Sequence, residues 1–313
     1  MAWLKPWKGY EPNVVFDITA VQHSCCGPHA IILHCAPVTV PPMTDTSAFL
    51  DWPYPRWIAH RGAGVLAPEN TLAAFRLGAS FAYRMFECDV KLSRDGVPFL
   101  LHDDTLTRTA RPLHGQHATD PQGSAVAGQH AWHTLAQLDA GSWHSPVYAG
   151  EPLPTLEAIA RFCISNGYFL NIEIKPTLGT ERHTGEVVAR HAAQLWQGLA
   201  VQPLLTSFDI AALEGAMAAQ PALPRGLLIH ALDGQSWAQW LGHASRLQCQ
   251  AIVCNHELWS AESVPLAKAA GFRLLSYTVN DESEAQRLLD LGTDGLITDR
   301  VDHFQPQSES STR

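Results

Sequence analysis

Charged side chains stand two residues apart in two apolar segments of the chain. Glu87 and Asp89 lie in MFECDV, and Glu173 and Lys175 lie in NIEIK. If both segments are strands, each pair shares one face, because side chains alternate along a strand. Three carboxylates that face one another form an oxygen-only site, which suits Mg²⁺ or Ca²⁺, whereas Zn²⁺ favours histidine or cysteine. The sequence therefore predicts a divalent cation bound by these three carboxylates.

Two histidines and an arginine end apolar runs of the same kind. WIAHR places His60 and Arg61 after one run, and FLLHD places His102 after another. With the carboxylates occupied by a cation, the imidazoles are free for proton transfer. Such a set suits hydrolysis of a phosphate diester, in which cations bind the phosphoryl oxygens while one histidine accepts a proton and the other donates one. A sugar hydrolase would instead need a carboxylate pair and less positive charge.

Each of these residues also has a structural interpretation. A single histidine after a strand is more often a packed or capping residue than a catalyst. Lys175 could merely neutralise Glu173 or Glu87 in an ion pair. Burial of an unpaired carboxylate on a strand face costs on the order of several kcal/mol of folding free energy, as for other buried ions. The pair of Glu87 and Asp89 therefore favours a functional site.

Short apolar segments alternate with longer amphipathic ones from Arg56 onward, which is typical of parallel strands covered by helices. The predicted strands are 56–60, 85–90, 168–175, 203–208, 225–230, 251–255, 273–279 and 294–299. Helix starts are predicted at Glu69 or Asn70, at Asp209, at Ser260 with Gly271 as the end, and at Asp281 with Glu284 in a capping box.

The strand count predicts an α/β fold, the TIM (β/α)8 barrel, because doubly wound open sheets usually have five or six strands. The segment at about 103–154 breaks the alternation, since it is polar and holds at most one short helix near AWHTLAQLDAG. It follows the second strand, so we expect a small insertion that forms a lid or rim at the barrel mouth. Active sites of this fold lie at the C-terminal strand ends. The charged residues above and Tyr277, near the end of the seventh strand, would converge there.

The composition limits the partners and the location of the protein. Its 313 residues carry a formal net charge of -9, which argues against binding nucleic acid or an anionic membrane surface. No apolar run is long enough to cross a bilayer. Seven cysteines without a regular disulfide spacing favour reduced thiols in the cytoplasm. We expect a disordered or non-native arm at 1–51, the barrel at 52–305 and a polar tail at 306–313.

Short motifs occur in a fixed order from Trp52 to His303. They are HRG at 60–62, PENT at 68–71, ExD at 87–89, LLHDDTLTRT at 100–109, LDAGSW at 138–143, GEPLPTLEA at 150–158, NIEIKP at 171–176, YTVND at 277–281 and DGLITD at 294–299. Together they resemble the glycerophosphodiester phosphodiesterases. WPYPRWIAHRGAG and NIEIKPTLGT are most similar to the bacterial cytosolic members linked to glycerol-phosphate uptake.

The resemblance implies a fold, a reaction and a role for each site residue. The family's fold is a TIM barrel with a small insertion after the second strand, and its members hydrolyse glycerophosphodiesters to sn-glycerol 3-phosphate and an alcohol. The implied roles are general acid and base for His60 and His102, phosphate binding for Arg61 and Lys175, and binding of Mg²⁺ or Ca²⁺ for Glu87, Asp89 and Glu173. Many members carry tryptophan where this chain has Tyr277, which keeps an aromatic wall for the glycerol.

Several alternatives stay open at this point. Some related enzymes act on lysophospholipids, a lysophospholipase D reaction, although the polar insertion offers no evident path for an acyl chain. A barrel that binds glycerophosphodiesters without hydrolysing them is a further alternative. The preferred alcohol, the metal, the assignment of acid and base, and the attacking hydroxyl (water or the glycerol 2-hydroxyl) are not decided by the sequence. A homodimer is also compatible with the resemblance.

Overall fold

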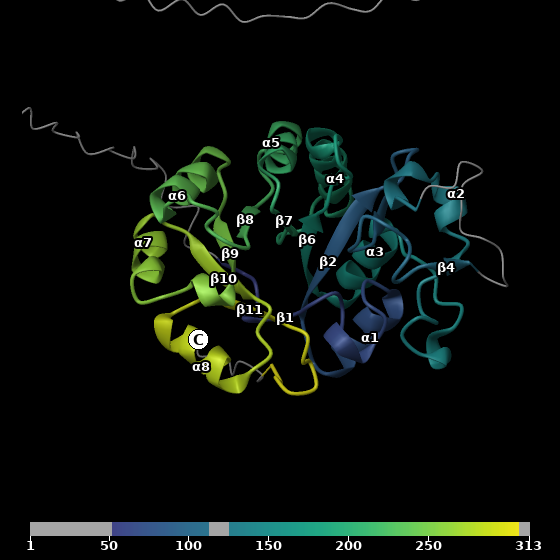
Figure 1. Ribbon diagram of the computed structural model, residues 1–313, viewed down its shortest axis with the longest axis horizontal. Coiled ribbons are helices and arrows are strands. Elements are labelled where there is room, and N and C mark those ends of the chain that lie inside the picture. Colours follow the sequence, from purple (N-terminus) through teal and green to yellow (C-terminus); the bar gives the residue numbers. More distant parts are fainter. Residues whose placement is uncertain (1–51, 113–124, 307–313) are drawn as a thin grey trace, which may run out of the picture. The chain divides into compact units, whose positions relative to one another are not determined.

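Eight parallel strands form a closed barrel in the computed structural model, which describes residues 52–112 and 125–306 (Figure 1). In their order around the barrel they are β1 (Trp57–Ala59), β2 (Met85–Leu92), β6 (Phe169–Ile174), β7 (Leu204–Ser207), β8 (Arg225–Ile229), β9 (Ala251–Asn255), β10 (Arg273–Tyr277) and β11 (Gly295–Thr298). β1 closes the barrel, because it pairs in parallel with both β11 and β2. The predicted TIM barrel is confirmed, and each predicted strand segment overlaps one of these strands, although β2 runs two residues beyond the predicted 85–90.

Helices cover the outside of the barrel (Figure 1). They are α1 (Leu72–Ser80), α3 (Leu156–Asn166), α4 (Glu181–Leu195), α5 (Ile210–Ala219), α6 (Trp237–Arg246), α7 (Ser263–Ala269) and α8 (Glu282–Leu291). Side-chain oxygens of Thr155, Asp209 and Ser236 accept hydrogen bonds from backbone N–H groups in the first turns of α3, α5 and α6. Such caps satisfy donors that have no partner within the helix. None of the described helices is long and apolar enough to cross a membrane.

The start of α1 differs from the prediction. The cap is Thr71, whose hydroxyl oxygen accepts a hydrogen bond from the backbone of Ala74, and not Glu69 or Asn70. The side chain of Asn70 is engaged elsewhere, in hydrogen bonds with Asp89. These hydrogen bonds with a residue of β2 occupy the side chain of Asn70. The capping role that its residue type favours therefore falls to Thr71.

The predicted ends of two later helices are partly wrong. α7 begins at Ser263 and not directly after Ser260, whose hydroxyl accepts a hydrogen bond from the backbone N–H of Ser263 in the turn that precedes the helix. Asp281 caps α8 as predicted, but Glu284 binds Arg287 and His256 and does not complete the capping box. The nearby Arg287 and the more distant His256 thus decide where the side chain of Glu284 points.

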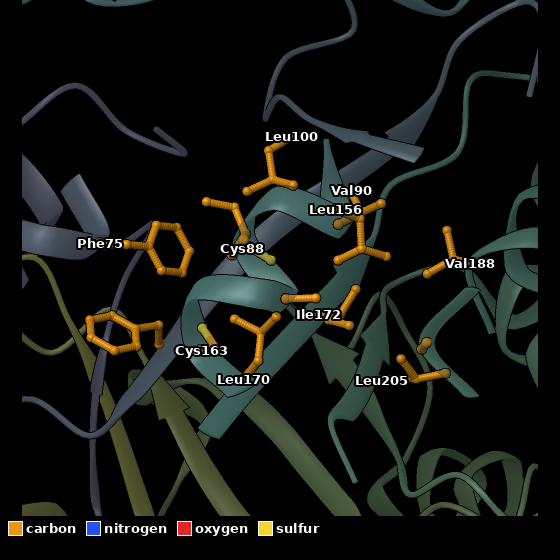
Figure 2. Packing of buried hydrophobic residues seen from close by; sticks show 14 of the residues in the cluster. Phe75, Cys88, Val90, Leu100, Leu156, Cys163, Leu170, Ile172, Val188 and Leu205 are labelled. Carbon is orange, nitrogen blue, oxygen red and sulfur yellow. The ribbon is translucent and has the colours of Figure 1, made fainter. Parts of the chain in front are cut away.

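The interior of the barrel is apolar in the half that contains the N-terminal ends of the strands. The side chains that pack there include Ile58, Met85, Leu204, Leu228, Val253, Leu275 and Ile297, one from each of seven strands. A second apolar layer lies between the strands and the helices outside them, and Figure 2 shows Cys88, Ile172 and Leu170 packing there against α3. Cys88 thus faces away from its neighbours Glu87 and Asp89, because side chains alternate along a strand.

The described part of the insertion lies at the rim of the barrel mouth. It follows β3 (Pro98–Leu100), which pairs antiparallel with β2, and contains β4 (Arg111–Pro112), α2 (Trp132–Leu135) and β5 (Leu138–Asp139). Arg108 donates hydrogen bonds to Glu69, and His144 Nε2 lies 3.0 Å from the carbonyl oxygen of Val65, so the insertion is held against the loop that follows β1. Residues 113–124 of the insertion, the predicted arm at 1–51 and residues 307–313 of the predicted tail lie outside the described residues.

Candidate active site

Three carboxylates meet where β2 and β6 run side by side. Asp89 stands opposite Glu173 in the parallel pairing of the two strands, and Glu87 lies two residues before Asp89 on the same face. Oxygen atoms of the three side chains all lie within 4.8 Å of one another. The side chains of Glu87 and Asp89 are only 3% and 1% exposed. The structure thus brings the three predicted metal ligands together in a buried cluster.

The chemistry of this cluster fits a hard divalent cation. Oε1 of Glu87 is buried and accepts no hydrogen bond from the described residues. Burial, and next the negative charge of Asp89, raise the pKa of Glu87 to about 8. Closely spaced carboxylates in a poorly solvated site repel one another. A cation that takes carboxylate oxygens as ligands, such as Mg²⁺ or Ca²⁺, would remove this repulsion.

Asn70 holds one of the carboxylates in place. Its Nδ2 donates to Oδ2 of Asp89 at 2.8 Å, and the backbone N–H of Asp89 donates to Oδ1 of Asn70 at 3.0 Å. Asn70 has φ of +59°, a left-handed conformation that asparagine adopts more readily than most residues. The sequence did not reveal this role, because PENT also has the pattern of a helix start.

Each predicted catalytic histidine pairs with an aspartate through Nδ1. In His60 this atom lies 2.6 Å from Oδ1 of Asp299, and in His102 it lies 2.8 Å from Oδ1 of Asp103. A carboxylate at Nδ1 fixes the tautomer and the orientation of the ring and leaves Nε2 for other partners. Nε2 of His60 lies 3.8 Å from Oε2 of Glu87, next to the carboxylate cluster. The sequence did not single out either aspartate, although both lie in the motifs LLHDD and DGLITD.

The surroundings shift the pKa values of the two imidazoles in opposite directions. Burial alone would lower the pKa of His60, but the hydrogen bond with Asp299 and the charge of Glu87 outweigh it, so the pKa is raised. Burial lowers the pKa of His102, and the nearby cation Lys175 acts in the same direction. Opposite shifts are typical of paired groups that divide the roles of acid and base.

Arg61 and Lys175 both contact the carboxylate cluster. Arg61 Nε lies 3.2 Å from Oδ2 of Asp89, and its Nη1 donates to Glu69 at 3.0 Å. Lys175 Nζ donates to Oε1 of Glu173 at 3.1 Å and lies 3.8 Å from Oδ1 of Asp89. The ion pair considered for Lys175 is therefore present. Because both cations also line the pocket described next, they can contact an anion bound there.

A pocket of about 220 Å³ joins these groups at the barrel mouth. Besides His60, His102, the two cations and two of the carboxylates, it is lined by Asn171, Phe208, Leu228, His230, Tyr277, Thr278 and Ile297. The ring of Tyr277 meets that of Phe208 edge to face at 5.8 Å, and its hydroxyl donates to the carbonyl of Ile229 at 3.2 Å. The hydroxyl is thus engaged, and the ring forms a wall of the pocket. Phe208 and His230 directly follow β7 and β8, the position that this fold uses for functional side chains.

Comparison with known proteins identifies relatives over most of the chain. Residues 60–303 match the sequence profile of the Glycerophosphoryl diester phosphodiesterase family. A glycerophosphodiester phosphodiesterase of Bacillus subtilis is 26% identical over 257 residues, which covers 79% of this chain and 84% of the relative. One from Caldanaerobacter subterraneus is 27% identical over 246 residues, with coverages of 77% and 93%. A solved phosphodiesterase from Oleispira antarctica, in complex with the product sn-glycerol-3-phosphate, superimposes with a TM-score of 0.69 at 32% identity, covering 80% of this chain and 96% of that one.

Proposed function

Because the chain belongs to the glycerophosphoryl diester phosphodiesterase family and is thus a phosphoric diester hydrolase, we propose that it hydrolyses glycerophosphodiesters to sn-glycerol 3-phosphate and an alcohol. The observation that carries this proposal is the convergence of two histidines, two cations and two members of the three-carboxylate cluster on one pocket. The Oleispira antarctica relative was solved with sn-glycerol-3-phosphate, which supports the same product here. The net charge of -9 supports a small substrate over nucleic acid.

We propose that Glu87, Asp89 and Glu173 hold a divalent cation, Mg²⁺ or Ca²⁺. The buried Glu87 oxygen without a hydrogen-bond partner and the raised pKa of its carboxyl support this assignment. When bound, such a cation polarises a phosphoryl oxygen and stabilises the charge that develops during the reaction. Arg61 and Lys175 bind the remaining phosphoryl oxygens, since both line the pocket beside the cluster.

We propose that His60 and His102 carry the two proton transfers. One Nε2 accepts the proton of the attacking hydroxyl while its oxygen bonds to phosphorus, and the other donates a proton to the alkoxide that leaves as its P–O bond breaks. The attacking hydroxyl belongs to water, or to C2 of the glycerol if a cyclic phosphate forms first and water then opens it. Asp299 and Asp103 act as positioning residues, because each binds Nδ1 of one histidine.

The test is release of sn-glycerol 3-phosphate from glycerophosphoethanolamine by the purified protein, with Mg²⁺, with Ca²⁺ and after treatment with a chelator. Release that requires either cation is the expected result. Release that survives complete removal of metal would overturn the role of the carboxylate cluster but keep the reaction. No release with either cation from the folded protein would overturn the substrate assignment, and lysophospholipids would then be assayed in the same way.

We also propose a cytoplasmic location. The cysteines in the part of the chain that the structure describes, Cys88, Cys163, Cys249 and Cys254, are free and buried, which is expected in a reducing compartment. Cell fractionation with a specific antibody tests this. A homodimer stays a prediction, which light scattering of the purified protein would check.

A further inference from the structure

A lysine at the barrel mouth is almost completely buried. Lys91 follows Glu87 and Asp89 on the same face of β2, and its side chain is 1% exposed. Nζ donates a hydrogen bond to Oδ1 of Asp104 at 2.7 Å, whereas the side chain of Asp104 is 74% exposed. An ammonium group carries three N–H donors. Within residues 52–112 and 125–306, Asp104 is the one acceptor that binds Nζ, so two donors are available to a ligand.

Lys91 lines a second pocket that adjoins the first. This pocket has a volume of about 290 Å³. Both pockets are lined by His102, Glu173, Lys175 and Phe208, so they meet at the proposed reacting groups. A phosphodiester has two alcohol arms, and the first pocket holds the aromatic wall proposed for the glycerol. The second pocket is therefore the space available to the other arm.

The carboxylates that only the second pocket contains already have partners. Asp103 accepts hydrogen bonds from Arg108, Asp104 binds Lys91, and Asp209 caps α5. Asp103 and Asp209 are thus engaged, and an ammonium bound at Asp104 would lie beside the ammonium of Lys91. The pair of Lys91 and Asp104 instead presents free donors beside a solvent-accessible acceptor. That arrangement matches hydroxyl groups, because each hydroxyl both donates and accepts.

We propose that the second pocket binds the leaving alcohol, and that Lys91 and Asp104 favour an alcohol with several hydroxyl groups, such as glycerol or a cyclitol. The assignment rests on the proposed hydrolysis of glycerophosphodiesters. Nζ of Lys91 donates to one hydroxyl oxygen of the departing alcohol, and Asp104 accepts from its neighbour. The ammonium of an amino alcohol offers no acceptor to Lys91, and at Asp104 it brings its own positive charge close to that of Lys91, which is unfavourable.

The test compares hydrolysis of glycerophosphoglycerol with hydrolysis of glycerophosphoethanolamine. Lys91→Met keeps an unbranched side chain of similar length and removes the donors. It should lower kcat/KM for glycerophosphoglycerol by at least about tenfold, within the range for sites built to bind a hydroxyl. For glycerophosphoethanolamine the decrease should be less than about threefold. The ratio of the kcat/KM values for the two diesters therefore measures the effect of the lost contact. Glu157→Gln is the matched control, because Glu157 forms an exposed ion pair with Arg161 on α3 and should leave the ratio unchanged.

A second variant distinguishes loss of the proposed contact from an effect of the substitution on folding. Asp104→Asn changes an exposed side chain, keeps Lys91, and should shift the ratio in the same direction by a smaller factor. An equal loss for both diesters, or an unchanged ratio in both variants, would overturn the proposal. Glycerophosphoserine is assayed in the same way, and a loss confined to that diester would indicate that Lys91 binds the carboxylate of the serine and would overturn the proposal as well.

A separate measurement distinguishes failure of this assignment from failure of the proposed function. If the wild-type protein hydrolyses neither diester, the proposed function is wrong. Calorimetric titration of the wild type and of Lys91→Met with glycerophosphoglycerol and with glycerophosphoethanolamine then decides the assignment. Weaker binding of the first compound alone supports the role of Lys91, and equal binding by both proteins contradicts it.

Discussion

The imidazole of His60 lies 2.6 Å from the carboxylate of Asp299, a residue 239 positions later in the chain. His60 directly follows β1 and Asp299 directly follows β11, and these two strands pair where the barrel closes. The contact connects the histidine to the seam of the barrel and, together with the charge of Glu87, outweighs the effect of burial on its pKa. The imidazole proposed for catalysis thus depends on a residue that need not touch the substrate.

Asp299→Asn should lower kcat by at least about tenfold, because an amide neither stabilises the imidazolium nor enforces the tautomer. The carboxylate raises the pKa of His60, so its loss should move the limb of the pH–rate profile that reports His60 to lower pH. Rates measured across the neutral pH range check both effects. Asp302→Asn is the control, since Asp302 pairs with Arg300. An unshifted profile with normal kcat would contradict the positioning role.

Removal of either histidine should abolish most of the activity. His60→Ala and His102→Ala are each expected to lower turnover by at least about a hundredfold, the scale for loss of a general acid or base. Steady-state rates with glycerophosphoethanolamine check this, together with metal content. His133→Ala serves as control, because His133 is an exposed residue of the insertion. A variant that keeps a near wild-type rate with normal metal content would remove that histidine from the mechanism.

The stability of the metal-free protein should fall as pH rises. Burial and the charge of Asp89 raise the pKa of Glu87 from 4.5 to about 8 in the folded state. The native state therefore binds more protons than the unfolded state between these values, and stability is lost across that interval. Thermal unfolding in the presence of a chelator, at a series of pH values, checks the direction. A bound divalent cation should raise Tm and remove the dependence, since it binds the native state.

Glu87→Gln separates the charge from the shape of that side chain. The amide is neutral in both states, whereas the wild-type carboxyl must take up a proton on folding at neutral pH, so the chelated variant should unfold at a higher temperature than the chelated wild type. The same variant should lose most of the rise in Tm that Mg²⁺ or Ca²⁺ produces. A full response to the metal in Glu87→Gln would show that Glu87 is not a ligand.

Asn70 should contribute to both stability and activity. Asn70→Ala removes two hydrogen bonds with Asp89 and places alanine at φ of +59°. A loss of about 2 kcal/mol in the free energy of unfolding is expected from an unsatisfied buried group and backbone strain. Denaturant titration measures it. Asn70→Gly relieves the strain but not the lost hydrogen bonds, so a glycine variant as stable as wild type would contradict the role of the side chain.

The alternation of side chains along a strand, which repeats every two residues, explains which site residues could be predicted from the sequence. Alternation along a strand is a local property. It predicts that Glu87 shares a face with Asp89, and Glu173 with Lys175, without any knowledge of how the strands pair. The barrel strands were recognisable because strands buried on both faces are continuous apolar runs. The distances between the carboxylates follow from the pairing of β2 with β6, which the strand order of the fold supplies.

Contacts between distant segments explain what the sequence could not predict. Nothing near Asp299 in the chain indicates that it faces His60, because that contact exists only when the barrel closes. Asn70 has the residue type of a helix cap, and only the nearby β2 shows why Thr71 has that role. Lys91 was not singled out from the sequence, and only the structure gives its ammonium group a partner, Asp104 in the segment after β3.

Because the chain is synthesised from its N-terminus, closure of the barrel by β11 also has a consequence for translation. β11 is the last of the barrel strands to be synthesised, and domains generally fold only as units. A nascent chain that ends after β10 already contains both histidines and every proposed metal ligand. It still has no strand to pair with the free edge of β1 and no carboxylate to orient His60. Hydrolytic competence should therefore arrive with the segment that carries β11 and Asp299, and chains terminated before it should remain inactive.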